Sequence, residues 1–109
     1  MAIDSKDIAG PDFLTGRFTS GGPAADVTET LPWAPTLFIL YSDIAATNPN
    51  MVVQSAASTT NTMYTTGTSG DITLVLVAAG IYIDVTAKTV KIDADMQSSS
   101  GVNAWIAFK

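Results

Sequence analysis

The sequence contains no cysteine and no histidine among its 109 residues. Without cysteine there is no disulfide framework, no thiolate metal site and no thiol nucleophile. Without histidine the chain lacks the side chain that most often acts as a general base or as a metal ligand. These two absences exclude most hydrolase active sites, so we expect a protein that is not an enzyme and that carries no cofactor.

Charged residues are also scarce, at 14% of the chain, with ten acidic and five basic side chains and a net charge of −5. Nucleic-acid affinity depends on a high density of lysine and arginine, so neither DNA nor RNA is expected as a partner. The basic residues are scattered along the sequence and form no cluster that would hold an anionic membrane. They are Lys6, Arg17, Lys88, Lys91 and Lys109. A surface so poor in charge suits close contact with another protein, and it equally suits a weakly charged β domain.

Long hydrophobic runs are missing as well. The most apolar stretch, residues 72–85, is interrupted by Thr73, Gly80 and Asp84, and it is shorter than the ~20 residues of a membrane-spanning helix. The first seven residues carry acidic side chains and lack the apolar centre of a signal peptide. We therefore expect synthesis in a cytoplasm and no association with a membrane.

Glycine and proline punctuate residues 1–35 and interrupt both helix and strand patterns. This segment is expected to be an extended N-terminal arm that orders on a partner or along its own domain, and a floppy terminus is the alternative. Aromatic residues are uncommon in disordered tails, which favours the arm. Residues 36–109 are expected to form the β domain and to fold without the arm. The predicted partner-binding residues are Ile8, Phe13, Leu14, Phe18 and Trp33.

Short strand patterns begin after the arm. Apolar runs at 36–41 and 51–54 predict two strands, and a segment rich in threonine at 62–66 predicts an exposed strand. A mobile loop is the alternative for the polar segment 55–70. Residues 72–79 are apolar on both faces apart from one threonine, which predicts a central strand covered on two sides.

The last third of the chain has the clearest alternation. Apolar residues alternate with polar ones at 81–85 and 90–96, which predicts a β-hairpin around the loop 86–89, and residues 102–108 predict a last strand. Several short strands with turn signals at near-regular spacing are typical of a sandwich or barrel. The predicted fold class is therefore all-β, a small antiparallel β-sandwich or barrel with an extended N-terminal arm.

Carboxylates are the remaining candidates for chemistry. Asp93 and Asp95, which follow Asp84, form the one acidic cluster in which an acid–base pair could lie. With a loop carbonyl near Gln97, Asp93 and Asp95 could also form a weak calcium site. In the predicted hairpin they share one polar strand face, so a solvated sheet edge explains them better, and the loop pattern of an EF-hand is missing. We predict no catalytic residue and no metal ligand.

Aromatic side chains suggest a different kind of site, since exposed aromatic rings favour sugar-stacking surfaces. Trp33 and Tyr64 are the candidates for such stacking, and Trp33 lies between two prolines. Packing in the core is the competing interpretation for both. Trp105 alternates with apolar neighbours in the predicted last strand and is expected in the core or at an interface.

Five general features of the chain occur together in one class of proteins. They are a length near one hundred residues, the punctuated segment 8–35, a middle rich in threonine, serine and alanine, the apolar run 70–80, and the ending Trp105-Ile106-Ala107-Phe108-Lys109. In these features the chain resembles small virion proteins of tailed bacteriophages, and is most similar in kind to capsid decoration or cement proteins.

This resemblance implies a β-rich structural protein that binds the outer surface of a phage head and stabilises the shell against internal DNA pressure. It implies the major capsid protein or other virion subunits as partners, a homo-oligomer that is often a trimer, and a location on the capsid surface. A head–tail connector or a tail structural component is the alternative among virion proteins. A carbohydrate-binding β module is the alternative from another class.

Overall fold

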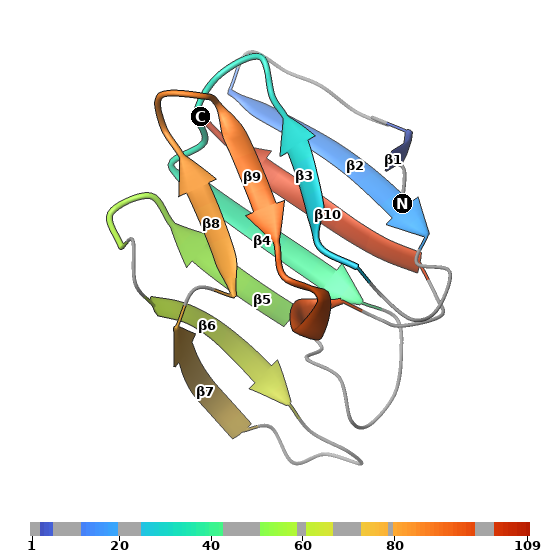
Figure 1. Ribbon diagram of the computed structural model, residues 1–109, viewed down its shortest axis with the longest axis vertical. Helices are drawn as coiled ribbons and strands as arrows, with labels where there is room; N and C mark the ends of the chain where they lie inside the picture. Colours follow the sequence, from blue (N-terminus) through green and yellow to red (C-terminus); the bar gives the residue numbers. More distant parts are fainter. Residues whose placement is uncertain are drawn as a thin grey trace.

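Two antiparallel β-sheets, packed one over the other, make up the fold (Figure 1). Seven strands form the larger sheet in the order β1-β2-β10-β4-β5-β6-β7, and three strands form the smaller sheet in the order β3-β9-β8. The predicted all-β fold is therefore confirmed, and its form is a sandwich. The computed structural model describes residues 3–5, 12–19, 25–42, 51–58, 61–66, 73–78, 80–97 and 102–109.

The larger sheet consists of β1 (Ile3–Ser5), β2 (Phe13–Thr19), β4 (Leu37–Ser42), β5 (Met51–Ser55), β6 (Asn61–Thr66), β7 (Thr73–Ala78) and β10 (Val102–Phe108). The smaller sheet consists of β3 (Val27–Thr30), β8 (Ile81–Asp84) and β9 (Thr89–Ile92), and a 3₁₀ turn, η1 (Ala94–Met96), follows β9. In Figure 1 the smaller sheet lies in front of the middle strands of the larger one, whereas β7 lies beyond it.

Alternation along the strands builds one core between the two sheets. On β2, Leu14 and Phe18 are buried while Arg17 is exposed, as the two-residue period of a strand requires. The remaining buried apolar side chains come from both sheets and from the turns that join them. They are Val27, Leu31, Phe38, Leu40, Val52, Ile81, Ile83, Val90, Ile92, Met96, Trp105 and Ala107.

Trp105 belongs to this core, and its position depends on a glycine on the neighbouring strand. Its ring stacks on Phe38 with 5.4 Å between the centroids and 28° between the planes. The residue paired with Trp105 on β2 is Gly16, where a Cβ atom would lie 2.6 Å from the indole Cε2. Real side chains do not make so close a contact. Gly16 is therefore needed because the indole lies against the backbone of β2.

Buried hydrogen bonds join the two sheets beside β6. The Thr62 hydroxyl donates to Gln54 Oε1 at 2.6 Å and accepts from the Ile81 backbone N–H at 2.9 Å. Thr62 is fully buried, and Gln54 is 2% exposed. One hydroxyl thus satisfies polar groups on β5 and β8 at the same time, which links the larger sheet to the smaller one.

Replacing Thr62 by valine should destabilise the protein, because valine keeps the shape of threonine and removes both hydrogen bonds. A buried group that loses its partner costs about 1–3 kcal/mol, so we expect the free energy of unfolding to fall by about 2–4 kcal/mol. Thr62→Ser keeps the hydroxyl and is the matched control, with a smaller loss. Denaturant unfolding of the two variants measures the difference. Equal stability of the valine and serine variants would contradict a structural role for these hydrogen bonds.

The predicted separation of an arm from a β domain at residue 35 needs correction. β2 pairs with β10 along seven residues, from Phe13 opposite Phe108 to Thr19 opposite Val102, and β3 pairs with β9. The strands β2, at 13–19, and β3, at 27–30, thus belong to the same two sheets as the rest of the described chain. The glycine at position 16, which suggested an irregular arm, is instead the residue on which Trp105 packs.

The prediction for residues 72–79 is also wrong in one respect. This segment does contain a strand, β7, but β7 is the last strand of the larger sheet and not a central one. Leu76 is 66% exposed, whereas Val77 is partly buried against the core. Apolar residues on both faces of a strand are typical of a strand that other elements cover on two sides. For β7 this pattern was misleading, because β7 lies at the edge of the sheet.

The predicted hairpin is confirmed, with small changes at its ends. β8 and β9 pair from Ile81 opposite Ile92 to Asp84 opposite Thr89, and Lys88 adopts a left-handed backbone with a φ of 58°. The second strand ends at Ile92 and does not continue to Met96, because Asp93 caps the 3₁₀ turn through a hydrogen bond from the backbone N–H of Asp95.

Candidate functional site

The face of the larger sheet that points away from the smaller sheet carries a continuous row of apolar side chains. Strand registers place Ile106, Ile39, Val53, Met63 and Leu76 opposite one another in turn, from β10 through β4, β5 and β6 to β7. Cross-strand partners lie on the same face of a sheet. We call this surface, on β2, β10, β4, β5, β6 and β7, the outer face.

Further apolar residues flank this row on the outer face. Tyr41 lies opposite Ala104 and Met51, and Phe108 lies between Phe13 and Leu37. Six of the eight large apolar side chains that are exposed in the described ranges belong to the outer face: Tyr41, Met51, Met63, Leu76, Val102 and Phe108. Contiguous exposed apolar surface on a folded protein marks an interaction site more often than scattered residues do.

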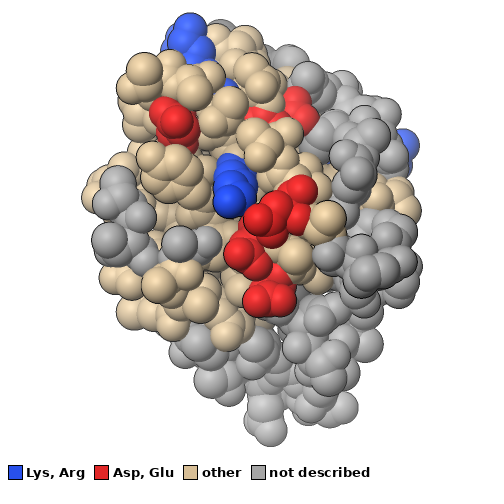
Figure 2. Space-filling view, in the orientation of Figure 1, with Lys and Arg blue, Asp and Glu red and all other residues tan. Residues whose placement is uncertain are grey.

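Charge is distributed unequally between the two sides of the sandwich. Figure 2 shows the side of the smaller sheet, where acidic side chains gather around a lysine. There Lys91 forms an ion pair with Asp26 at 3.5 Å, and Asp26 also accepts a hydrogen bond from the backbone N–H of Ala94. On the described strands of the outer face, the register places one charged residue, Arg17. A partner that covers the outer face therefore removes water from fewer charged groups than a partner that covers the smaller sheet.

A hollow of about 290 Å³ opens on the outer face over β2, β10 and β4. Its lining includes Thr15, Ile39, Tyr41, Ala104 and Ile106, and most of that lining is apolar. Ala104 lies between Arg17 and Tyr41 in the register, so its small side chain leaves space between longer neighbours. The hollow is large enough to receive an apolar side chain from a partner protein.

The four predicted partner-binding residues that the structure describes do not form one surface. Leu14 is 5% exposed and Phe18 is fully buried, so both belong to the core and are not accessible to a partner. Trp33 is partly buried and packs against the same core, and Ile8 lies outside the described residues. Of the four that the structure describes, Phe13 alone lies on the outer face, opposite Phe108.

Sequence reasoning missed most of the outer face, although one signal was present. Residues 37–41 are apolar at every position, and a strand with one face in solvent would alternate. Ile39 and Tyr41 were therefore candidates for a second apolar surface. Joining them to Met63 and Leu76 requires the order and register of the strands, which the sequence does not state.

The acidic residues have structural roles in turns. Asp84 accepts hydrogen bonds from the backbone N–H groups of Thr86 and Ala87, at 3.1 and 3.0 Å, and Asp93 caps η1. Such Asx turns stabilise the backbone without any ligand. Within the ranges that the structure describes, no three acidic side chains come together as a metal site would need.

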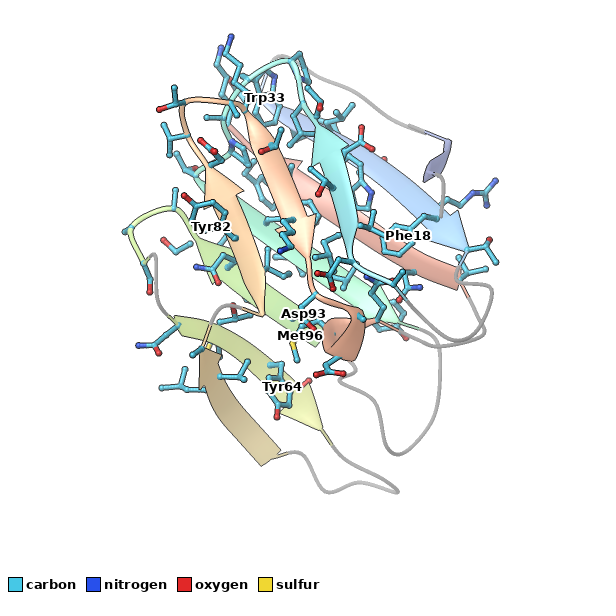
Figure 3. The ribbon with its side chains drawn as sticks, viewed as in Figure 1. Phe18, Trp33, Tyr64, Tyr82, Asp93 and Met96 are labelled. Carbon is cyan, nitrogen blue, oxygen red and sulfur yellow. The ribbon has the colours of Figure 1, made fainter. Side chains whose placement is uncertain are left out.

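The aromatic residues do not form a sugar-stacking surface in the described structure. Tyr64 and Trp33 are partly buried and pack against the core, and they lie far apart in Figure 3. Trp105 is 3% exposed. Tyr41 and Tyr82 are exposed, but they lie on opposite sides of the sandwich, because Tyr82 belongs to β8 and Tyr41 to the outer face.

Among the described residues, no helix is long and apolar enough to cross a membrane. Comparisons of the chain with family models, with curated proteins and with solved structures gave no significant match.

Proposed function

We propose that this chain is a structural protein without catalytic activity, and that it acts by docking its outer face on other protein subunits. The observation that carries the proposal is the row of apolar side chains from Ile106 to Leu76, flanked by Tyr41, Met51 and Phe108. A face of this kind is suited to protein contact, because an interface core is poor in charge and rich in aromatic residues and methionine.

The dimensions of the outer face fit this role. Neighbouring strands lie about 4.8 Å apart and each residue extends a strand by about 3.3 Å. The strands from β2 to β7 therefore span about 24 Å, and six residues along each strand span about 20 Å. The projected area, about 500 Å² before side-chain relief is counted, is comparable with the ~800 Å² per partner of a standard interface.

Within this class of function, we propose a capsid decoration protein that binds the outer surface of a phage head, with the major capsid protein as partner. The support is the resemblance in length, composition and segment order, together with an apolar face opposite an acidic one. Many copies bound to one lattice reinforce the shell even when each contact is modest. A head–tail connector or tail component would use the same face against a different virion subunit.

Tyr41→Lys tests the proposed docking face directly. Tyr41 is 56% exposed, so lysine there is compatible with the fold, but docking would then have to bury an ammonium group. Burial of a large apolar side chain contributes about 1.5–3 kcal/mol, and about 1.4 kcal/mol corresponds to a tenfold change in affinity. We expect binding to shells of the major capsid protein from the same virus to weaken at least about tenfold, as measured by co-sedimentation.

Tyr82→Lys is the matched control, because Tyr82 is 45% exposed and lies on the smaller sheet. This variant should bind the shell like the unaltered protein, and both variants should keep the same β-type circular dichroism. Loss of binding in the Tyr82 variant with full binding in the Tyr41 variant would assign docking to the smaller sheet. Full binding by both variants would contradict the proposed face.

A further inference from the structure

The two edges of the larger sheet differ in a way that matters for association. The first edge is β1, which has three residues, includes Asp4, and pairs with β2 through an irregular register between Ile3 and Ser5. A short strand, a charge and a bulge are the features by which natural sheets prevent their edges from pairing with other chains. The β1 edge is thus protected.

The other edge, β7, has none of these features. It has six residues without charge or proline, and its register with β6 is unbroken from Asn61 opposite Ala78 to Thr66 opposite Thr73. In the part of the chain that the structure describes, no strand pairs with its far side. Leu76 and Ala78 are exposed. A long, regular, uncharged edge of this kind leaves a row of backbone N–H and C=O groups open to another strand.

We propose that β7 is a dimer interface, at which two copies of this chain pair β7 with β7 in antiparallel orientation. The contact is isologous, because the same strand serves on both sides of a two-fold axis perpendicular to the sheet. The result is one continuous sheet across two copies. This dimer forms in the protein alone in solution and needs no shell.

The chemistry of β7 favours a second copy as the occupant. Antiparallel pairing of a strand with its own copy places the residues in the middle of the strand beside their symmetry mates, so a charge there would face a like charge. β7 carries none, and the exposed Leu76 instead supplies apolar contact. Because the opposite edge is protected, pairing ends at two copies and does not continue into a fibre.

The same pairing also extends the outer face. A two-fold axis perpendicular to the sheet keeps the outer faces of both copies on one side, so the apolar row that ends at Leu76 continues into the partner copy. The dimer therefore presents about twice the apolar area of a single chain to any surface on which it docks. This continuity distinguishes edge pairing from face-to-face packing of two outer faces, which would bury the row instead of extending it.

The test is sedimentation equilibrium of the full chain, with hydrogen exchange of the β7 amides measured at low and high protein concentration. We expect a monomer–dimer equilibrium, and greater protection of β7 amides at high concentration. Leu76→Lys removes the apolar contact of both copies and places like charges near the two-fold axis, so it should raise the dissociation constant at least about tenfold. Ala78→Lys places a lysine at the end of the exposed edge, which discourages pairing with another strand, and it should weaken the dimer in the same direction by a smaller factor.

Met51→Lys is the matched control. Met51 is 40% exposed on the outer face but lies on β5, two strands away from the edge. The Met51→Lys variant should dimerise like the unaltered protein. Loss of the dimer in this variant would show that two outer faces pack against each other, and would overturn the proposal. A protein that stays monomeric at millimolar concentration would also overturn it, as would species that grow beyond the dimer. None of these measurements involves a shell, so their outcome is separate from that of the docking experiment.

Discussion

Deletion of residues 1–19 should abolish cooperative folding of this protein. The deletion removes β2, which lies between β1 and β10 and pairs with β10 along its whole length. It also removes Leu14 and Phe18 from the core. Truncation of a buried leucine to alanine costs about 2–5 kcal/mol and of a buried phenylalanine about 3–5 kcal/mol. Their sum is comparable with the total stability of a small domain, about 5–15 kcal/mol.

Thermal unfolding followed by circular dichroism and calorimetry measures this effect. The matched control is deletion of residues 1–11, which removes the three-residue edge strand β1 and leaves β2 in place. The shorter deletion should retain a cooperative transition, and the longer one should show none. A cooperative β-type transition in the longer deletion would restore the division expected from the sequence, in which residues 36–109 fold without the preceding segment.

The strands that the sequence predicted well are those whose pattern is local. The segments 36–41, 51–54, 62–66 and 102–108 each correspond to an observed strand, and the hairpin of β8 and β9 is confirmed. Alternation and strand-forming residues are properties of a few neighbouring positions. The turn roles of Asp84 and Asp93 are local in the same sense, since each accepts a hydrogen bond from the backbone two residues later.

The features that the sequence did not predict depend on distant residues. In the sequence, Gly16 suggests a break in a strand pattern. A glycine is needed there because Trp105, on the neighbouring strand β10, packs against it. Residues 72–79 were predicted to be a central strand. The sequence does not show that the smaller sheet covers the middle strands of the larger sheet and ends before β7 (Figure 1). Both errors come from inferring the neighbours of a segment from its own composition.

The candidate site was not predicted either, because it also depends on residues that are distant in the sequence. Ile39, Val53, Met63 and Leu76 belong to four strands, and each residue alone resembles an ordinary apolar strand position. They become one surface only when the strand order places them in a row. The prediction instead favoured Leu14 and Phe18, whose spacing along the chain suggested anchors but which alternate into the core.

Phe18→Ala and Phe13→Ala should have opposite effects on stability and on docking. Phe18 is fully buried between the sheets, so its truncation should lower the free energy of unfolding by about 3–5 kcal/mol. Phe13 is partly buried on the outer face, opposite Phe108, so its truncation should cost only about 1 kcal/mol. Denaturant unfolding of the two single variants gives both values.

Shell binding then separates the two roles. At a temperature where both variants are folded, Phe18→Ala should bind the shell of the major capsid protein with unchanged affinity, because no part of its side chain reaches the surface. Phe13→Ala should bind more weakly, because Phe13 extends the apolar outer face at its β2 side. Weaker binding by folded Phe18→Ala would instead support the contact through an extended N-terminal arm that the sequence predicted. Unchanged binding by Phe13→Ala would limit the docking face to β10, β4, β5, β6 and β7.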